Sequence, residues 1–493
     1  MSTLGEHGEA PAVGQTAVLR RIRARIMLGV LGRLTPTLIA LFAVPMILAI
    51  IDDQWLFVGR LAAGGAIVVI IALIGRTISL GDDVRPHEVL AATALTFLLG
   101  TLGMTWPLMI YGLPFVDGLF EAMSGITSTG FTVVSDIEQW PWSAQITRAW
   151  LQWYGGFVIL VAVIAVILEP GVAARRLGAI DVEGTTIVAS MSQRARVVIV
   201  TYSLLTLLCF AMVFAAHPEL VPAISLTLTA VSTGGFSVYG DSLASLPVLA
   251  SAILLLFCVA TAVPIDHYEY LRRRRFSLFF RDTEILLLGY LVAFGFGLMV
   301  LLGWFADGTL SWRGIYDLFF VTASAHSTAG FSTASVAELT DAQKALLIGL
   351  MVIGGAVGST AGGIKLLRAR VMMETLRTAI LRTAIGPNSI LVVRVGETRI
   401  HGREIEGIIG IIGLFLIAHF TSWIILTAHG LDPVDALFDI VSALSTVGLS
   451  TGVASADLAD HLKLLFVLNM WLGRLEVIAV VILLSPWSWL KRN

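Results

Sequence analysis

A short Ser/Thr/Gly string recurs four times in this chain and constrains the fold more than any other feature. The copies span residues 126 to 131, 231 to 236, 326 to 331 and 444 to 449. Each follows a short apolar run that opens on a proline or a small acidic cluster, and each precedes a long apolar segment. Because the copies are almost evenly spaced, the sequence predicts four repeats of one structural unit.

The composition indicates that these units lie in a membrane. Hydrophobic residues make up 57% of the chain and charged residues 13%, whereas soluble domains have about 45–50% apolar and about 25% charged residues. The excess is concentrated in blocks of about 20 residues with few charges, which are long enough to cross a bilayer. The sequence therefore predicts a polytopic helical membrane protein.

The arginines predict which loops face the cytoplasm. They cluster at residues 20 to 25, 175 to 176, 272 to 275 and 368 to 382, while the alternate loops are mostly acidic. Positive charge marks the cytoplasmic side, so we expect both termini in the cytoplasm. Residues 1 to 15 are polar and the first apolar segment is too long for a signal peptide, so no cleavable leader is expected.

Each unit reads as an outer span, a short helix, the Ser/Thr/Gly loop and an inner span. We expect an all-α membrane protein with about ten full spans and about four half-spans. Its predicted parts are a cytoplasmic tail (1–27), two additional N-terminal spans (28–84) and four units arranged around one pseudo-fourfold axis (85–178, 179–277, 278–399 and 400–493).

The short helices determine where the loops lie. They are expected to begin near Pro114, Pro222, Trp312 and Asp432 and to run for only about a dozen residues, too few to cross a membrane. Non-helical backbone at that depth is tolerated only where it is buried in protein or lines water. Four equivalent loops therefore most simply meet on one axis and form a pore.

Such a pore favours a cation. The four short helices would point their C-terminal ends, each carrying roughly half a negative charge, toward the axis. Loop carbonyls could then replace the hydration shell of the ion. A single Ser-Thr-Gly string is typical of an ordinary turn, but four at matching places favour a filter. The predicted ion-binding residues are Thr127, Ser128, Thr129, Gly130, Ser232, Thr233, Gly234, Gly235, Ser327, Thr328, Ala329, Gly330, Ser445, Thr446, Val447 and Gly448.

A glycine-rich segment interrupts the inner span of the third unit. Each glycine costs up to about 1 kcal/mol in a helix relative to alanine, so we expect a loop under the filter. Close packing of helices through small residues is the alternative. The candidate residues are Gly354, Gly355, Gly358, Ser359, Thr360, Gly362, Gly363 and Lys365.

Arg474 lies inside the last apolar span. An arginine at that depth costs at least about 2.5–3.5 kcal/mol and is functional by default. Pairing with Glu476 or capping of carbonyls on a neighbouring helix are the structural alternatives.

From residue 85 to 490 the chain resembles the TrkH/KtrB/HKT superfamily of potassium transporters, with one characteristic glycine in each filter loop. The two additional N-terminal spans favour the TrkH branch. Residues 358 to 365, Gly-Ser-Thr-Ala-Gly-Gly-Ile-Lys, match the segment where the family has its intramembrane gate. The chain departs from the pattern at Leu449, where the other units have Phe, which could change the packing of the fourth loop.

This resemblance implies more than the residues alone. It implies potassium as the transported ion, a homodimer in the bacterial inner membrane, and Arg474 pointing into the pore beside the gate. In the TrkH branch a cytosolic nucleotide-binding ring, TrkA, controls the gate. The sequence has no Rossmann or Walker fingerprint of its own, so nucleotide control would come from such a partner; we expect no organic cofactor and no nucleic-acid partner. The arginine-rich segments are candidate docking surfaces or contacts with membrane lipid.

The leading hypothesis is therefore potassium uptake through a channel-like pore, not an enzyme activity. A proton- or sodium-coupled potassium symporter of the same fold remains an alternative. An alternating-access cation carrier would more often show units of opposite topology, whereas every unit here is expected to begin and end inside. A sodium-preferring pore would favour Ser in the first loop, where this chain has Gly130.

Overall fold

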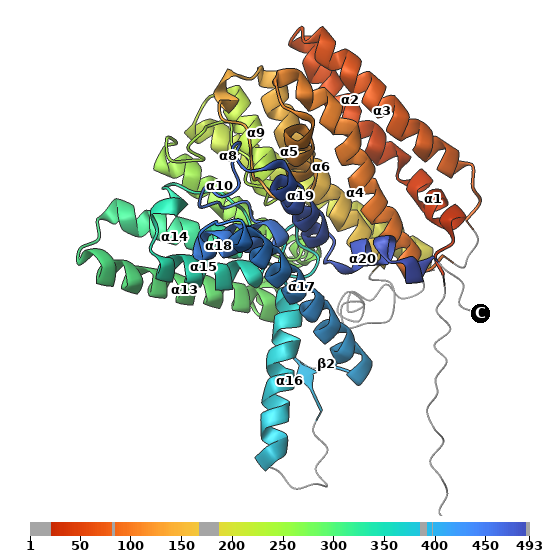
Figure 1. Cartoon of the computed structure of the whole chain (residues 1–493). Coiled ribbons are helices and arrows are strands. Elements are labelled where there is room, and N and C mark those ends of the chain that lie inside the picture. Colours follow the sequence, from red (N-terminus) through yellow and green to blue (C-terminus); the bar gives the residue numbers. More distant parts are fainter. Residues whose placement is uncertain (1–20, 81–83, 167–186, 385–391, 397, 490–493) are drawn as a thin grey trace, which may run out of the picture.

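The computed structural model describes residues 21–80, 84–166, 187–384, 392–396 and 398–489 (Figure 1). Within these ranges the regular secondary structure is helical except for one antiparallel pair, β1 (Arg394–Val395) and β2 (Thr398–Arg399). The predicted all-α fold class is confirmed. The predicted tail at residues 1–27 and the arginines at 175 to 176 lie largely outside the described residues.

Two hydrophobic segments precede the first unit, as the sequence predicted. The first consists of α1 (Ala24–Arg33) and α2 (Thr35–Ile51), which meet at a bend of 50°, and the second is α3 (Trp55–Arg76). Glycines allow close packing here. A Cβ on Gly75 would collide with the backbone of Leu28 in α1, and a Cβ on Gly64 would lie 2.5 Å from the carbonyl oxygen of Gly103 in the first unit.

The four units follow in order, each with an outer helix, a short helix and an inner helix. These are α4 (Pro86–Leu108), α5 (Phe115–Ile126) and α6 (Trp142–Val166); α8 (Ile187–Ala216), α9 (Leu220–Val231) and α10 (Val248–Thr261); α13 (Thr283–Asp307), α14 (Trp312–His326) and α15 (Asp341–Val352); and α17 (Gly402–Ala428), α18 (Pro433–Leu444) and α19 (Asp460–Arg474). We call α5, α9, α14 and α18 the pore helices.

The described chain has five helices that are long and apolar enough to cross a membrane, or eight if each of three bent pairs counts as one span. The sequence predicted about ten. The inner helices α6, which has 25 residues, and α15, which has 12, occupy the positions of the other two expected spans.

Three of the inner helices are broken, although the sequence predicted only one break. The expected break follows α15, where a loop (353–365) leads into α16 (Leu366–Ala384). The second unit bends by 96° between α10 and η3–α11 (Ile265–Arg272), next to Pro264, which cannot continue a helical hydrogen-bond ladder. The fourth unit bends by 115° between α19 and α20 (Ile478–Leu484), where Glu476 and Val477 have φ values of 56° and 65°.

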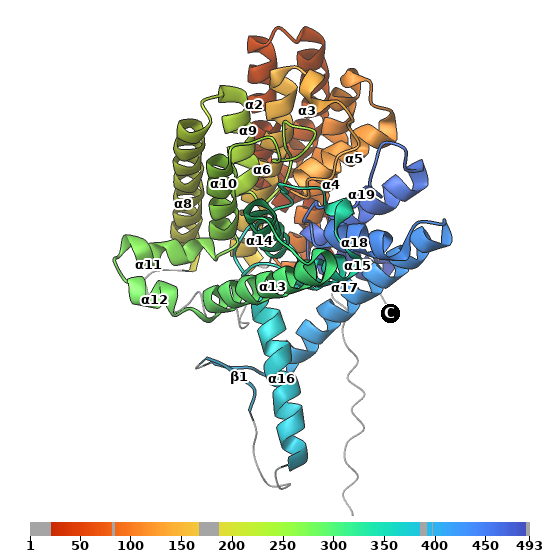
Figure 2. The same ribbon diagram turned by 90° about the vertical axis from the view of Figure 1, so that its left-hand side faces the viewer.

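The hydrophobic core joins neighbouring units. One cluster packs the N-terminal helices with the first and fourth units, a second joins parts of the first, second and third units, and another joins the third and fourth. The short helices α11 (Tyr268–Arg272) and α12 (Phe276–Phe280) connect the second and third units, and α16 projects away from the helical body beside β1 and β2 (Figures 1 and 2).

Candidate ion pathway

The four Ser/Thr/Gly loops have the same backbone conformation. A left-handed residue comes first, with φ values of 53° at Ser128, 52° at Thr233, 55° at Thr328 and 49° at Thr446. Two residues later each glycine is also left-handed, with φ values of 101°, 78°, 75° and 93° at Gly130, Gly235, Gly330 and Gly448. Left-handed backbone is strained for residues with a Cβ. The same strain at four equivalent places shows that the loops are copies of one design.

Each loop is attached to the end of its own pore helix. The backbone N–H of the residue before the characteristic glycine donates to the carbonyl oxygen five residues earlier. These bonds join Thr129 to Ser124 (2.9 Å), Gly234 to Thr229 (2.8 Å), Ala329 to Ser324 (2.9 Å) and Val447 to Ser442 (2.8 Å). They satisfy the carbonyls that a helix end leaves without partners.

The first hydroxyls of three loops also point back to the helices. Thr127, Ser232 and Ser327 each donate to the carbonyl oxygen four residues earlier. These bonds use the hydroxyl protons and leave the oxygen lone pairs, so both the hydroxyl and the backbone oxygens of the loops are candidate ion ligands.

The glycines close the four loops into a ring. A Cβ on Gly130 would collide with the carbonyl oxygen of Gly234 in the second loop, and one on Gly235 would lie 2.8 Å from that of Ala329 in the third. A Cβ on Gly330 would collide with the carbonyl oxygen of Val447 in the fourth loop. The circle closes because a Cβ on Gly448 would collide with the carbonyl oxygen of Thr129 in the first loop.

The fourth loop keeps this geometry in spite of Leu449. This leucine is buried, as are Phe131, Phe236 and Phe331 at the equivalent positions. The loop backbone of the fourth unit matches the others at Thr446 and Gly448. The possible change in packing that the sequence suggested is therefore not seen in the backbone.

Gln152 of α6 holds two loops together, a role that the sequence analysis missed. Its side-chain nitrogen donates to the carbonyl oxygen of Gly234, and its side-chain oxygen accepts from the backbone N–H of Phe236 at 3.1 Å. The hydroxyl of Ser128 in the first loop donates to the carbonyl oxygen of Gln152 at 2.9 Å. No pattern near Gln152 in the sequence marks these contacts, because the partners in the second loop lie about 80 residues away.

Arg148, one helical turn before Gln152, links the same two loops from the other side. Its guanidinium forms an ion pair of 3.1 Å with Glu121 in pore helix α5 and donates to the hydroxyl of Thr132 at 2.9 Å. It also lies over the ring of Phe236, 4.0 Å from the centroid. A charged residue inside an apolar span is a signal that could have identified Arg148, as it identified Arg474.

A vestibule of about 510 Å³ opens on the glycine side of the ring. All four loops line it, together with Arg148 and residues of the segments that follow the loops. Asp241 lines it, and the carboxylate of Glu138 accepts from the backbone N–H of Gly240 in the lining at 3.1 Å, so carboxylates lie at the rim. Burial, and then the nearby carboxylates of Glu219, Glu138 and Asp241, raise the pKa of Tyr239 to about 12.

The glycine-rich loop (353–365) lies on the opposite side of the ring. The backbone N–H of Gly362 donates to the hydroxyl of Thr328 in the third loop at 2.8 Å, and the hydroxyl of Thr233 in the second loop donates to that of Thr360 at 3.3 Å. A Cβ on Gly362 would collide with the carbonyl oxygen of Ser445 in the fourth loop. The segment is therefore a loop packed directly under the ring, and not a helix that packs through small residues.

The loop has its own internal order. Its two ends run side by side, because the N–H of Gly354 donates to Ile364 O at 3.1 Å and the N–H of Ile364 donates to Val352 O at 2.9 Å. Gly358 and Gly363 have φ values of 81° and 67°, and a Cβ on Gly355 would lie 2.5 Å from the side chain of Ala361. Lys365 donates through Nζ to the carbonyl oxygen of Ala361.

Arg474 reaches this loop. Its side chain is buried and its Nη1 donates to the carbonyl oxygen of Thr360 at 2.8 Å. Its Nε and Nη2 have no protein partner among the described residues. Glu476 pairs with Arg368 instead, so the alternative in which Glu476 neutralises Arg474 is wrong.

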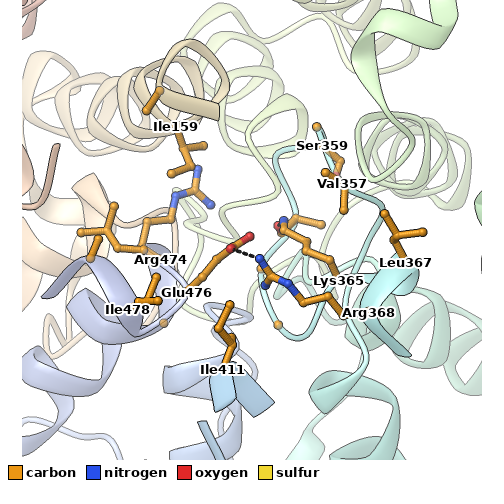
Figure 3. Close-up of a pocket in the computed structure, with 18 of the residues that line it drawn as sticks. Ile159, Val357, Ser359, Lys365, Leu367, Arg368, Ile411, Arg474, Glu476 and Ile478 are labelled. Atoms are coloured by element: carbon orange, nitrogen blue, oxygen red, sulfur yellow. Dashed lines mark hydrogen bonds and ion pairs between the residues drawn. The ribbon is translucent and has the colours of Figure 1, made fainter. Parts of the chain in front are cut away.

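Arg474, Lys365, Arg368 and Glu476 line a cavity of about 550 Å³ under the ring, whose other walls come from α4, α6 and α17 (Figure 3). The structure thus brings all the predicted site residues together: the ring lies between two cavities, and the glycine-rich loop and Arg474 lie between the ring and one of them.

The fold and this ring define a polytopic membrane protein with four repeats around one candidate cation pathway. The family of TrkH cation transport proteins matches residues 89–291 and 313–489. The chain is 29% identical over 420 residues to the Trk system potassium uptake protein TrkH of Halomonas elongata, with 82% of this chain and 86% of that protein covered.

A second relative is the Trk system potassium uptake protein TrkH of Escherichia coli K12, 27% identical over 390 residues, with 76% of this chain and 80% of that protein covered. The crystal structure of the potassium transporter TrkH from Vibrio parahaemolyticus superimposes with a TM-score of 0.81 at 21% identity and covers 95% of this chain and all of that one. The chain belongs to the TrkH family of cation transport proteins, which confirms the TrkH branch that the sequence favoured.

Proposed function

We propose that this chain takes up potassium through a channel-like pore whose narrowest part is the ring of four loops. The observation that carries the proposal is the closed circle of contacts in which each glycine abuts the carbonyl of the next loop. Two of the relatives named above are potassium uptake proteins. An ion on the axis of such a ring could exchange its water for main-chain oxygens from four directions.

The charges around the ring suit inward movement of a cation. The acidic rim of the vestibule raises the local concentration of cations. The C-terminal ends of the four pore helices stabilise positive charge at the ring. A negative potential inside the cell then supplies about 2.3 kcal/mol per charge per 100 mV. With one characteristic glycine in each loop, we expect fewer ordered ion sites than in a potassium channel.

The glycine-rich loop and Arg474 are proposed as the gate. A loop packed under three filter loops blocks the direct path, and a buried guanidinium beside it raises the barrier to a cation. The hydrogen bond from Arg474 to Thr360 holds the loop in this position. Opening requires that the loop move away from the ring and that this bond break. We assign Lys365 a supporting role, because its ammonium also lies at the cavity but bonds within the loop.

The family and the charge pattern also support a proposal for the membrane, the orientation and the partners of the chain. We propose a homodimer in the bacterial inner membrane with both termini in the cytoplasm, under the control of a cytosolic TrkA-type nucleotide-binding ring. The projecting helix α16 (Leu366–Ala384) is a suitable lever, because it continues directly from the glycine-rich loop. A partner that moves α16 would act on the loop without contact with the ring.

Growth of a potassium-uptake-deficient bacterium at low external potassium tests the proposal. The intact chain should restore growth and ⁸⁶Rb⁺ uptake, whereas Gly235→Ser should impair both because the new side chain would enter the ring. Gly308→Ser is the matched control, since Gly308 has a φ of 68° but open space around it. A chain that reaches the membrane and yet restores no growth would refute potassium uptake.

A further inference from the structure

Two exposed histidines of the fourth unit face each other on the vestibule side of the ring. His429 is the C-cap residue of α17, and His461 lies in the first turn of α19. Their Nε2 atoms are 3.0 Å apart. The segment that leads into α19 lines the vestibule from Gly448 to Ala454, so the pair lies on that face of the protein.

Hydrogen bonding fixes the protonation pattern of this pair. The Nδ1 atom of His429 lies 2.7 Å from the carbonyl oxygen of Ile425. A carbonyl can only accept, so Nδ1 of His429 carries the proton and Nε2 of a neutral His429 has a free lone pair. The Nε2 atom of His461 must then supply the single proton between the rings.

This arrangement is that of a metal ligand with its supporting partner in place. Histidines that bind metals usually donate the other ring N–H to a carbonyl or carboxylate, which fixes the tautomer and orients the ring. The bond from His429 to Ile425 does this. Two imidazoles on one tetrahedral Zn²⁺, with Zn–N distances of about 2.0–2.1 Å, hold their nitrogens about 3.3 Å apart. A small separation of the two rings would reach that geometry.

We propose that His429 and His461 bind a divalent transition metal such as Zn²⁺ or Cu²⁺ through their Nε2 atoms. The proton that the rings share moves from Nε2 to Nδ1 of His461, and the metal takes its place, so both neutral imidazoles bind the metal through an Nε2 lone pair. Imidazole nitrogens select these metals over Mg²⁺ and Ca²⁺, which prefer oxygen. No group of three or more possible ligands occurs among the described residues, so water would complete the coordination and the metal would exchange with the external solution.

The site would tie the outer helix of the fourth unit to its inner helix. Elsewhere these helices are joined by Ser422 of α17 and Asn469 of α19, whose side chains hydrogen-bond at 2.9 Å and 3.1 Å. The far end of α19 carries Arg474, which holds the glycine-rich loop. A bound metal would restrain α19, the helix that carries Arg474, and we infer that it hinders release of the loop from Arg474 and so inhibits transport. This inhibitory effect rests on the proposed function, but the binding does not.

Titration of the purified full-length chain with Zn²⁺ alone, after removal of any purification tag, tests the binding. Loss of a residue that hydrogen-bonds a metal ligand weakens metal affinity by about 10–100-fold. His429→Gln or His461→Gln removes a ligand itself and should weaken the affinity for Zn²⁺ by at least this factor. His401→Gln, at the other end of α17, is the control and should bind Zn²⁺ as the wild type does. Equal affinity in the wild type and the double His429→Gln/His461→Gln variant would overturn the site.

The inhibition is tested by uptake of ⁸⁶Rb⁺ with external Zn²⁺. The wild type and His401→Gln should be inhibited, and the double variant should not. Inhibition that persists in the double variant, or a wild type that binds Zn²⁺ at this site without inhibition, would overturn the coupling to the gate. If the metal-free wild type takes up no ⁸⁶Rb⁺, the proposed function fails, while the titration still decides whether the metal site exists.

Discussion

Replacement of Gly448 by alanine separates the contact between loops from ordinary backbone strain. Gly448 has a φ of 93°, and a Cβ there would collide with the carbonyl oxygen of Thr129 in the first loop. A left-handed alanine costs roughly 1–2 kcal/mol, and the overlap with packed backbone costs about 1–3 kcal/mol more. The overlap can be relieved only if the first and fourth loops move apart, which changes the ring.

Gly112 provides the matched control. It has a φ of 86°, but nothing lies within 4 Å of a Cβ at that position. Gly112→Ala therefore carries the backbone cost alone, and we expect it to lower stability slightly while ⁸⁶Rb⁺ uptake stays close to normal. Gly448→Ala should lower the unfolding temperature further and reduce uptake or the preference for K⁺ over Na⁺.

Thermal unfolding of the purified variants and competition uptake of ⁸⁶Rb⁺ against Na⁺ would measure both effects. The reasoning is refuted if Gly448→Ala transports with normal rate and ion preference, since the ring would then tolerate a side chain at its contact. It is equally refuted if Gly112→Ala loses transport to the same degree at equal amounts in the membrane.

Three further changes test the parts around the ring. Arg474→Ala removes a hydrogen bond of a charged donor, and this bond is worth about 1.5–3 kcal/mol. The equilibrium between the closed and open gate should shift toward the open state by roughly tenfold to a hundredfold. Unchanged ⁸⁶Rb⁺ flux in a folded protein would show that Arg474 is not part of the gate. Gln152→Met leaves the N–H of Phe236 and the carbonyl of Gly234 without a side-chain partner, at about 1–3 kcal/mol each, and should lower both the unfolding temperature and the uptake of ⁸⁶Rb⁺. Gln152→Glu keeps one acceptor and should give values between those of the wild type and Gln152→Met. Equal values for the two variants would contradict this. Lys463 pairs with Asp117 at 2.5 Å, so Lys463→Met leaves a buried carboxylate without its partner and should lower the free energy of unfolding by about 3–5 kcal/mol. Lys463→Met/Asp117→Asn should recover part of this loss. A double variant that is no more stable than Lys463→Met in thermal unfolding would count against a buried pair.

The features that could be predicted from the sequence are those repeated within it or costly in a membrane. The four loops were visible because the same residues return at matching places, and the short helices before them because a dozen residues cannot cross a bilayer. The glycine cluster and Arg474 were visible because each is expensive inside an apolar span. The structure places all of these residues together, while their roles in transport stay predictions.

The contacts that assemble these parts could not be predicted, because they join residues far apart in the sequence. Nothing around Gln152 indicates that it holds the second loop, and nothing around Lys344 indicates its ion pair of 2.7 Å with Asp435 in the next unit. The break at Val477 was also hidden, because a β-branched residue is an outlier at a positive φ and local preference argues against it. Tertiary packing sets the conformation there.

The circular order of the ring has a consequence for protein engineering. Because the Cα atom of every glycine packs against the peptide group of the next loop, no single loop of the ring can be changed without affecting its neighbours. A chimera that receives one loop from a relative with different ion preference would carry mismatched surfaces on both sides of the insert. Exchange of all four loops at once would keep the mutual fit, and it is therefore the better design for a chain with altered selectivity.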